Sequence, residues 1–423
     1  MKKILYGTTA LVAAGLAAGQ ADAASGLKLG ITGFYRGSMS AVIGGDSALA
    51  GPLVNGVGTS TAGFGDYGRT SGGFRQEIRL NFTGETTLDN GLTVGVLVGI
   101  NGENLIAVGS HTTPQKRSYA DFKGKFGDIR FGEYESAETT DCVVDPGNVT
   151  ANFGVNSPNE SFANGGRGSG FPTITNKTIG VAPFGSIGTC YGVESRGTKI
   201  GYFSPSLGGF TFGITYTPSG STRNPGGGYF YGTDLKPGIH NIVAAAFDYN
   251  GDFGGGVTLT VGGGGEWALE ADDSFGTSTG DKPSTYLLGF QLGLPGGFTV
   301  GASGEYTLNY KKAGYAATDA FPSDDGWIVS AGAAYTVDAV SVGLQGIYSQ
   351  WEVFGNQGTD TIWGVALTGA YALGPGINLE AQVAYNKYDA NDVFGVGPFV
   401  AGGYANPMTY DAVSIGGGFA INF

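Results

Sequence analysis

Five carboxylates crowd one short stretch of the chain, EYESAETTDCVVDPGN, which begins at residue 133. They are Glu133, Glu135, Glu138, Asp141 and Asp145. Such a density of negative charge attracts cations and, opposite a basic surface, sets up an electric field across the intervening water. A run of acids in a loop is also typical of an ordinary solvated surface. The stretch alone leaves both interpretations open.

Arginines in the preceding and adjoining segments could form the basic surface. Arg79, for example, lies between Ile78 and Leu80, so it points away from these apolar neighbours if the segment is a strand. The same alternation applies to all four arginines concerned, which are Arg36, Arg75, Arg79 and Arg130. We expect them to form a basic ladder on one wall. Pairing of the ladder with nearby glutamates is compatible with this arrangement.

No constellation of residues indicates catalysis. The two histidines, His111 and His240, fall in different predicted loops, without the partners of a metal site or a catalytic triad. The stretch GTSTGDK, residues 276–282, lacks the spacing and the ending of a phosphate-binding loop. We therefore expect no enzyme and no cofactor. Acidic pairs in outer loops, such as Asp272 and Asp273, provide at most sites for divalent cations together with lipopolysaccharide.

The only two cysteines, Cys142 and Cys190, lie in the same long, polar separator. An even pair of cysteines in an exported protein predicts a disulfide, because the compartments outside the cytoplasm are oxidising. On the chain-entropy model, a bridge that closes a loop of this length contributes about 4 kcal/mol. We expect the bridge to hold the shape of the loop. Free thiols and a metal site remain the alternatives.

The first residues of the chain have the features of a secretory signal peptide. Lys2 and Lys3 precede a short apolar run, which ends in the small residues Ala21 and Ala23. We therefore expect residues 1–23 to be removed and residues 24–423 to function outside the cytoplasm. No later stretch approaches the run of about 20 apolar residues that a spanning helix needs.

Segments of alternating polarity recur along the rest of the chain, and their separators are of two kinds. Short separators with turn chemistry lie at 88–91, 126–128, 204–209, 250–252, 294–297, 337–339 and 373–376. Long polar separators lie around 45–72, 102–115, 135–195, 218–238, 269–284, 311–325, 352–360 and 389–408. The seven turns and eight loops alternate strictly and therefore join sixteen strands. Short turns on one side and long loops on the other are typical of an outer-membrane barrel.

The two faces of the predicted strands support a barrel that contains water. In INLEAQVAYN, residues 377–386, Leu379 and Val383 alternate with Glu380 and Gln382. A barrel of sixteen strands leaves an aqueous channel, so the polar face can meet water while the apolar face meets lipid. The last segment, DAVSIGGGFAINF, must pair with the first strand, near residues 27–39, to remove the last sheet edge.

Two stretches and the last residue resemble one family of proteins. The stretches are FRQEIRLNFTGETTLDNGLTVGV, residues 74–96, and RSYADFKGKFGDIRFGEYES, which begins at residue 117 and enters the longest loop. With the terminal Phe423, they resemble the trimeric general porins of Gram-negative bacteria, in particular those of α-proteobacteria. The resemblance covers essentially the whole mature chain. Phe423 resembles the terminal phenylalanine by which the outer-membrane assembly machinery recognises its clients.

The resemblance implies an all-β protein, a 16-stranded antiparallel up-and-down transmembrane β-barrel whose long third loop folds into the lumen. It also implies a homotrimer in the outer membrane that allows passive diffusion of small hydrophilic solutes. In such a protein the loop at about 135–195 forms the pore constriction, and its acids face the arginine ladder. The lipid and lipopolysaccharide of the outer membrane and the assembly machinery are then the expected partners.

Other functions remain open on the sequence. The formal net charge of −13 argues against a nucleic-acid partner and predicts a mild preference for cations. A substrate-specific channel of the same fold is one alternative to general diffusion. A structural or adhesive barrel is another, although its length would be spread over exposed loops, whereas here it is concentrated in one loop.

Overall fold

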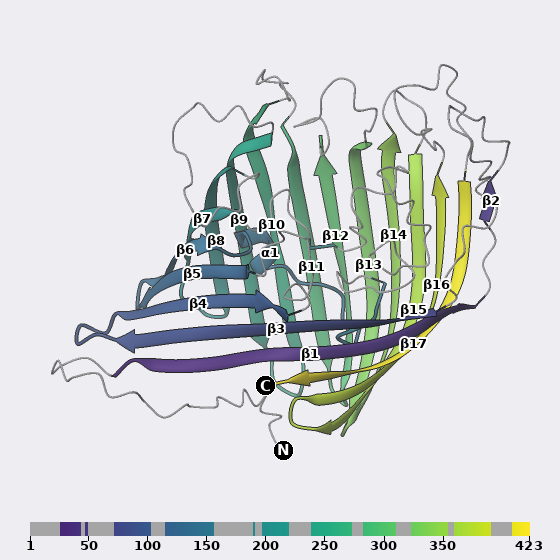
Figure 1. Ribbon diagram of the computed structural model, residues 1–423, viewed down its shortest axis with the longest axis horizontal. Helices are drawn as coiled ribbons and strands as arrows, with labels where there is room; N and C mark the ends of the chain where they lie inside the picture. The colour runs from purple at the N-terminus through teal and green to yellow at the C-terminus, as the bar shows by residue number, and fades with distance from the viewer. Residues whose placement is uncertain are drawn as a thin grey trace.

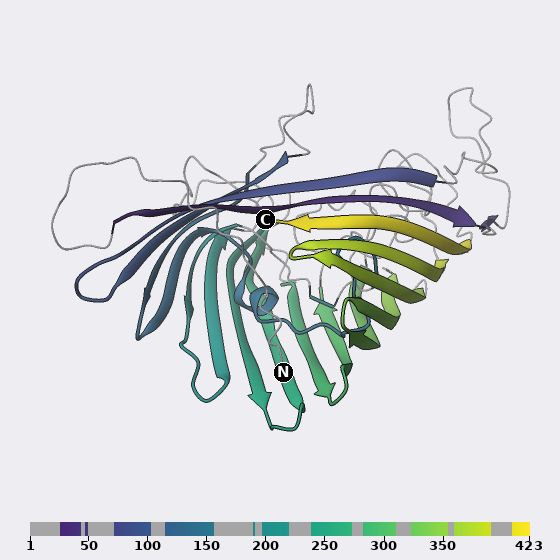
Figure 2. The same ribbon diagram turned by 90° about the horizontal axis from the view of Figure 1, so that it is seen from below.

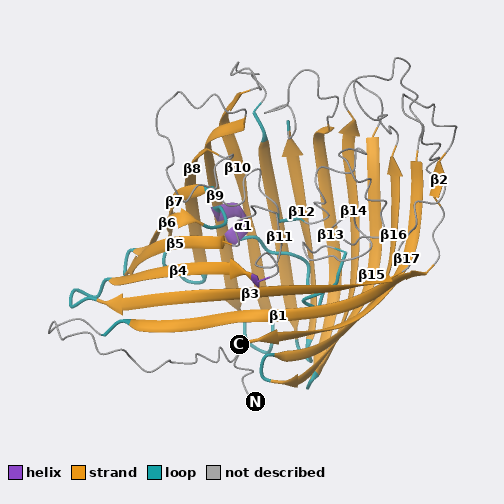
Figure 3. Cartoon of the chain, in the orientation of Figure 1, coloured by secondary structure: helices purple, strands orange, loops and turns teal. Residues whose placement is uncertain are grey.

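The structure is a computed structural model. It describes residues 26–43, 47–49, 72–102, 115–155, 189–190, 197–219, 238–272, 282–309, 323–353, 359–390 and 408–423. Nearly all of these residues form antiparallel strands, with one short helix, α1 (Ala137–Thr140), after β6 (Figures 1 and 3). None of the described helices is long and apolar enough to cross a membrane.

The first half of the sheet runs from the N-terminus to the first residues after the longest loop. Its strands are β1 (Lys28–Ile43), β2 (Ser47–Leu49), β3 (Gly72–Thr87), β4 (Thr93–Asn101), β5 (Gln115–Gly124), β6 (Gly127–Glu133), β7 (Thr198–Phe203) and β8 (Phe210–Ser219). The second half runs to the C-terminus. Its strands are β9 (Gly238–Asp252), β10 (Thr258–Asp272), β11 (Ser284–Leu294), β12 (Phe298–Leu308), β13 (Ser323–Val337), β14 (Val340–Val353), β15 (Thr359–Gly374), β16 (Ile377–Ala390) and β17 (Met408–Asn422).

Successive strands pair with each other, and β1 closes the sheet by pairing with β17. In this pairing Phe34 lies opposite Asn422 and Ile43 lies opposite Val413. The short strand β2 continues the same edge along the start of β17. Figure 1 shows the first strand, in purple, beside the last, in yellow. The described part of the chain is thus a closed barrel of sixteen main strands, which confirms the predicted fold class and the predicted place of closure.

The connections alternate in length as predicted, with one turn displaced. Residues 250–252 belong to β9, and the chain reverses at 253–257 instead. Phe253 N–H donates to Val257 O at 3.0 Å across this reversal. The three consecutive glycines at 254–256 all have positive φ angles, which glycine adopts without strain. The turn therefore forms where three glycines permit it, and not at the Asn-Gly pair just before them.

Side chains on the strands separate into an apolar outer face and a polar inner face. In β16, Leu379 is 47% exposed and Val383 is 51% exposed, whereas Glu380 is only 5% exposed. Aromatic side chains pack against one another on the outer face, as in the tilted pair Trp327 and Tyr348, whose ring centroids are 5.2 Å apart. An apolar outer band with aromatic residues is typical of strands that cross a membrane.

Some sequence predictions concern residues outside the described ranges, and one proves wrong. The predicted signal peptide, His111 and Asp273 all lie outside the described residues. His240 was expected in a loop but lies in β9, opposite Glu270 of β10. The strand begins at Gly238, where the predicted separator ends, so His240 is already its third residue.

Candidate functional site

The inner face of β1 and β3 carries Arg36 and Arg79 of the predicted ladder. Arg36 lies opposite Glu77 in the strand register, and Phe34 lies opposite Arg79. Glu77 pairs with both arginines, at 3.6 Å from Arg36 and 3.5 Å from Arg79. Both guanidinium groups lie over the ring of Phe34, at 4.0 Å and 5.0 Å from its centroid. The backbone of Arg75 lies in β3, and its side chain is outside the described part of the chain.

Arg117 on β5 is a fifth arginine of this wall and was not among the four predicted from the sequence. Its Nε and Nη2 atoms both donate to Glu135 Oε1, at 2.9 Å and 2.5 Å. A guanidinium group that donates twice to one carboxylate fixes both side chains. Arg117 shares the polar face of β5 with Asp121 and Lys123, and this spacing of two could have identified it from the sequence.

Arg130 on β6 lies in a different environment, among aromatic rings. Its Nε donates to Asp128 Oδ2 at 2.7 Å. Its guanidinium carbon is 4.4 Å from the ring centroid of Phe203 and 6.0 Å from that of Tyr134. Both rings are nearly buried, with exposed fractions of 8% and 2%. The aromatic side chains therefore hold Arg130 against the wall.

The segment that follows β6 contacts the inner face of the barrel from its first residues. Ser136 Oγ accepts a hydrogen bond from Lys199 Nζ at 2.8 Å and donates one to Glu266 Oε1 at 3.0 Å. Lys199 belongs to β7 and Glu266 to β10, and all three side chains are at most 1% exposed. In Figure 2, which shows the molecule from below, α1 lies on the concave side of the strands.

Asp145 forms the second contact of this segment, farther around the barrel. Its carboxylate accepts from Gln345 Nε2 at 3.0 and 2.9 Å, and from Ser330 Oγ. It also accepts from the backbone N–H of Gly147 at 3.0 Å. Asp145 is 1% exposed. This carboxylate therefore serves as a hydrogen-bond acceptor between the segment and strands β13 and β14.

Glu380 on β16 forms the third contact, in which the acceptor belongs to the wall and the donors belong to the segment. Its two carboxylate oxygens accept from the backbone N–H groups of Ala151 and Asn152, at 2.8 and 3.0 Å. Asn152 Nδ2 donates to the same carboxylate at 2.8 Å and to Phe419 O of β17 at 3.0 Å. Residues 134–155, which we call the strap, thus contact the inner face of the barrel from β5 to β17.

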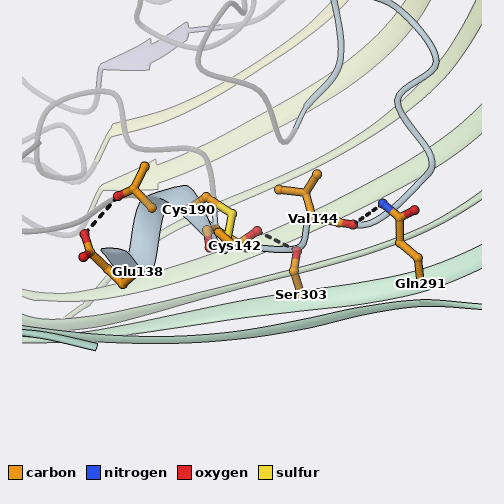
Figure 4. The surroundings of a disulfide bond; sticks show 8 residues. Glu138, Cys142, Val144, Cys190, Gln291 and Ser303 are labelled. Carbon is orange, nitrogen blue, oxygen red and sulfur yellow. Dashed lines mark hydrogen bonds between the residues drawn. A yellow bond between two sulfur atoms is a disulfide. The ribbon is translucent and has the colours of Figure 1, made fainter. Parts of the chain in front are cut away.

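A disulfide joins the strap to the returning end of the same loop. Cys142 and Cys190 are bonded, with Cα atoms 5.9 Å apart, as the sequence predicts. Figure 4 shows the bridge above the wall, where Val144 O accepts from Gln291 Nε2 at 2.8 Å. Thr189, next to Cys190, shares a hydrogen bond with Ser303 of β12 at 2.5 Å. Both ends of the bridge are therefore held on neighbouring strands.

Asp141 is the acid of the strap with a perturbed titration. Burial and the nearby carboxylate of Asp248 raise the pKa of Asp141 from 3.8 to about 6, and Arg130 opposes the rise. The raised pKa means that ionisation is disfavoured in the folded state. The stability that protonation provides is complete below about pH 4 and is lost as the pH rises through about 6. Asp141 therefore gains a full negative charge only near neutral pH.

The structure places the five predicted acids in different environments. Glu135 pairs with Arg117, and Asp141 is partly buried near Arg130. The other three are buried, with exposed fractions of 7% for Glu133, 0% for Glu138 and 1% for Asp145. The carboxylate of Glu138 accepts from Thr139 Oγ1 at 2.9 Å (Figure 4). The acidic stretch alone does not show this difference, because it depends on contacts with residues elsewhere in the chain, such as Arg117 and Gln345.

The described residues contain no arrangement of three or more histidines, cysteines or acids that could hold a metal ion. Arg36, Arg79, Arg117 and Arg130 are instead paired with carboxylates, and buried acids such as Asp145 and Glu380 accept hydrogen bonds. Such an arrangement can orient water and dipolar solutes without binding them tightly.

Comparisons with known proteins agree with this geometry. A family model described as Gram-negative porin matches residues 7–391. No curated protein matches the chain significantly. Among solved structures, the anion-selective porin from Comamonas acidovorans is similar with a TM-score of 0.56 at 14% identity, over 94% of this chain and 100% of that chain.

Two further solved structures are similar over almost the whole chain. The outer membrane channel DcaP of Acinetobacter baumannii has a TM-score of 0.55 at 13% identity, over 94% of this chain and 98% of that chain. The trimer form of OmpT from Vibrio cholerae has a TM-score of 0.51 at 12% identity, over 95% and 100%. At these identities the similarity concerns the fold.

Proposed function

Because the chain belongs to the family of Gram-negative porins, we propose that its pore admits small hydrophilic solutes and ions by passive diffusion and is narrowed by the strap. Family and closed barrel together place the protein in the outer membrane as a channel for solute diffusion. A barrel of this strand number leaves an aqueous channel that side chains of the wall do not fill.

One observation carries the proposed constriction: the strap is hydrogen-bonded along the inner face of the barrel, from Arg117 of β5 round to Phe419 of β17. Its further anchors include Lys199, Gln345 and Glu380. We propose that the charged side chains of β1 and β3, including Arg36 and Arg79, face the strap across the pore. In this proposal, solutes pass between the strap and the arginine wall.

The charges at this passage are proposed to act as a transverse field. Glu135 and Asp141 on the strap side face arginines on the wall, as the sequence analysis expected for the whole acidic stretch. Glu133, Glu138 and Asp145 would contribute through their buried contacts, by holding the strap in place. The proposed constriction comprises Arg36, Arg75, Arg79, Arg117, Arg130, Glu133, Glu135, Glu138, Asp141 and Asp145.

Further features of the family are proposed for this chain. A homotrimer is supported by the fold it shares with OmpT of Vibrio cholerae, one form of which is described as a trimer. Outer-membrane lipid and lipopolysaccharide would then contact the apolar band outside the trimer interface. Phe423 would serve as the recognition signal for the assembly machinery. Its backbone is already tied to Gly33 by two hydrogen bonds of 2.8 and 3.0 Å.

A substrate-specific channel is the second candidate, and the aromatic residues of the inner face bear on it. A specific track would need exposed aromatic or basic side chains along the pore. Tyr134 and Phe203 are nearly buried and contact Arg130, so they present little surface to a passing solute. This observation argues against an aromatic track at these two residues.

Electrical recording from the purified protein in planar bilayers tests the proposal. We expect stepwise increases in current, in groups of three if the trimer forms, and solute entry into liposomes that slows smoothly as sugar size increases. Absence of any current would refute the channel. Entry of one solute that saturates at low concentration would favour the substrate-specific alternative.

A further inference from the structure

The far end of the strap lies unusually close to the inner wall of β17. A Cβ atom added to Gly416 would lie 2.5 Å from Cε1 of the Phe153 ring. Carbon atoms in contact are normally about 3.5–4.0 Å apart, so a side chain at this position would push the ring away from the wall. Phe153 itself is only 2% exposed.

The same close approach recurs where the middle of the strap passes β14. A Cβ atom added to Gly343 would lie 2.2 Å from Gly147 O, which also accepts from Thr368 Oγ1 at 3.0 Å. The strap is therefore hydrogen-bonded to the wall at a distance that only glycine at the facing positions allows.

Glycines on the outer face of the same strands have room for a side chain. Gly417 lies next to Gly416 but points outward, and the nearest atom to an added Cβ is Glu380 O at 3.9 Å. Gly346 on β14 likewise has its nearest neighbours at 3.9 Å. On β14 and β17 these outward-facing glycines therefore lack the close approach that the strap makes to Gly343 and Gly416 on the inner face.

Glu380 provides the attraction that keeps the strap at this distance. Its carboxylate accepts from Ala151 N–H, Asn152 N–H and Asn152 Nδ2, the two residues directly before Phe153. Glu380 lies in the same register as Gly418 of β17, two residues from Gly416. Glu380 thus holds the end of the strap at the wall by hydrogen bonds, and Gly416 leaves the space that the ring of Phe153 occupies.

We propose that Glu380 and Gly416 are positioning residues that fix the distance of the strap from the wall, and so set the size limit for permeating solutes. The inference rests on the proposed function, since it assumes that the strap narrows the pore. The passage between the strap and strands β1 and β3 is widest when the strap lies directly against the opposite wall. Any change that lifts it off the wall narrows that passage.

Gly416→Ala tests the steric half of the proposal. The added methyl group needs about 1 Å of movement by the ring, which in a constriction several Å wide corresponds to a loss of conductance on the order of 1.5-fold. Entry of the larger sugars into liposomes should slow more than entry of the smaller ones. Gly417→Ala is the matched control, on the same strand with the same added methyl group, and should behave as the wild type.

Removal of the ring provides a rescue. In the double variant Gly416→Ala with Phe153→Ala, the methyl group has nothing to displace, while the hydrogen bonds to Glu380 remain. Its conductance should return to that of Phe153→Ala alone. A purely stabilising role for Gly416 predicts a lower melting temperature with unchanged conductance.

Glu380→Gln tests the attractive half and carries the test if Gly416→Ala fails to assemble. Glutamine replaces one acceptor oxygen with an amide that faces donors, so the strap loses at least one contact. We expect increased current noise and an altered size limit, with an unchanged reversal potential because the carboxylate is buried. The inference would be overturned if the wild type forms channels and both Glu380→Gln and Gly416→Ala have the same conductance and size limit as Gly417→Ala. Absence of channels in the wild type would instead refute the proposed function.

Discussion

Asp145 can act in two ways, and these predict different effects on stability and ion selectivity when the residue is changed. As a charge facing the pore, it would influence ion selectivity, and any neutral residue would have the same effect. As the buried acceptor seen in the structure, it holds the strap to β13 and β14, and the hydrogen-bonding capacity of its replacement decides the result. The pair Asp145→Ala and Asp145→Asn separates these roles, because both remove the charge and only one removes the acceptors.

The structure gives the expected size of the effect. In Asp145→Ala, Gln345 Nε2 and the N–H of Gly147 lose their acceptor, while Ser330 Oγ keeps Gly346 O at 3.1 Å. A buried donor without a partner costs about 1–3 kcal/mol, so the two together cost about 2–6 kcal/mol, toward the lower value if water enters from the pore. Asparagine keeps one acceptor oxygen and can donate to Ser330, so its cost is about 1 kcal/mol.

Urea titration of the folded protein in detergent micelles measures the difference. Unfolding can be followed through the four tryptophans, and bilayer recordings of the same samples give the reversal potential. We expect Asp145→Ala to lose clearly more stability than Asp145→Asn, with little change of the reversal potential in either. Equal stability losses, together with equal and large shifts of the reversal potential, would refute the anchoring role of Asp145.

Three further predictions concern the strap and the end of the barrel. Burial and Asp248 raise the pKa of Asp141 to about 6, so the wild-type reversal potential should shift toward anion preference as the pH falls from about 7 to about 5. Asp141→Asn should lack that shift. The same pH-dependent shift in the variant would contradict the assignment to Asp141. Cys142 and Cys190 should react with a thiol reagent only after reduction, and reduction should increase current noise; equal labelling before and after would exclude the bridge in the exported protein. Deletion of Phe423 should leave synthesis and export unchanged but lower the amount of heat-modifiable trimer on gels, and unchanged trimer levels would argue against its role in assembly.

Local rules explain why the strands were predictable. The alternation in residues 377–386 requires only that successive side chains of a strand face opposite sides, and each strand carries this information in its own sequence. Closure between β1 and β17 follows because an open edge in a membrane leaves backbone groups unpaired. The one displaced turn, at 253–257, arose where two adjacent stretches both had turn chemistry and glycines at 254–256 competed with an Asn-Gly pair.

The environments of the acids depend on distant residues and were not predictable in the same way. Glu135 and Asp145 are ten residues apart in one acidic stretch, yet one pairs with Arg117 and the other is buried against Gln345. The sequence contains the charge of each but not the strand that each meets. The role of Gly416 is hidden for the same reason, since a chain with 81 glycines does not reveal which of them faces the strap.

These environments change what the net charge of the chain says about selectivity. The formal charge of −13 predicts a preference for cations, but the carboxylates of Asp145 and Glu380 accept several hydrogen bonds, and the dipoles of these donors offset part of their charge. On the facing wall, Glu77 offsets part of the charge of the arginines it bridges. Among the described acids of the strap, Asp141 is then the group whose ionisation near pH 6 most directly alters the balance. A preference for cations that originates at the strap should therefore weaken in acid, whereas one that originates from the outer surface should not follow Asp141.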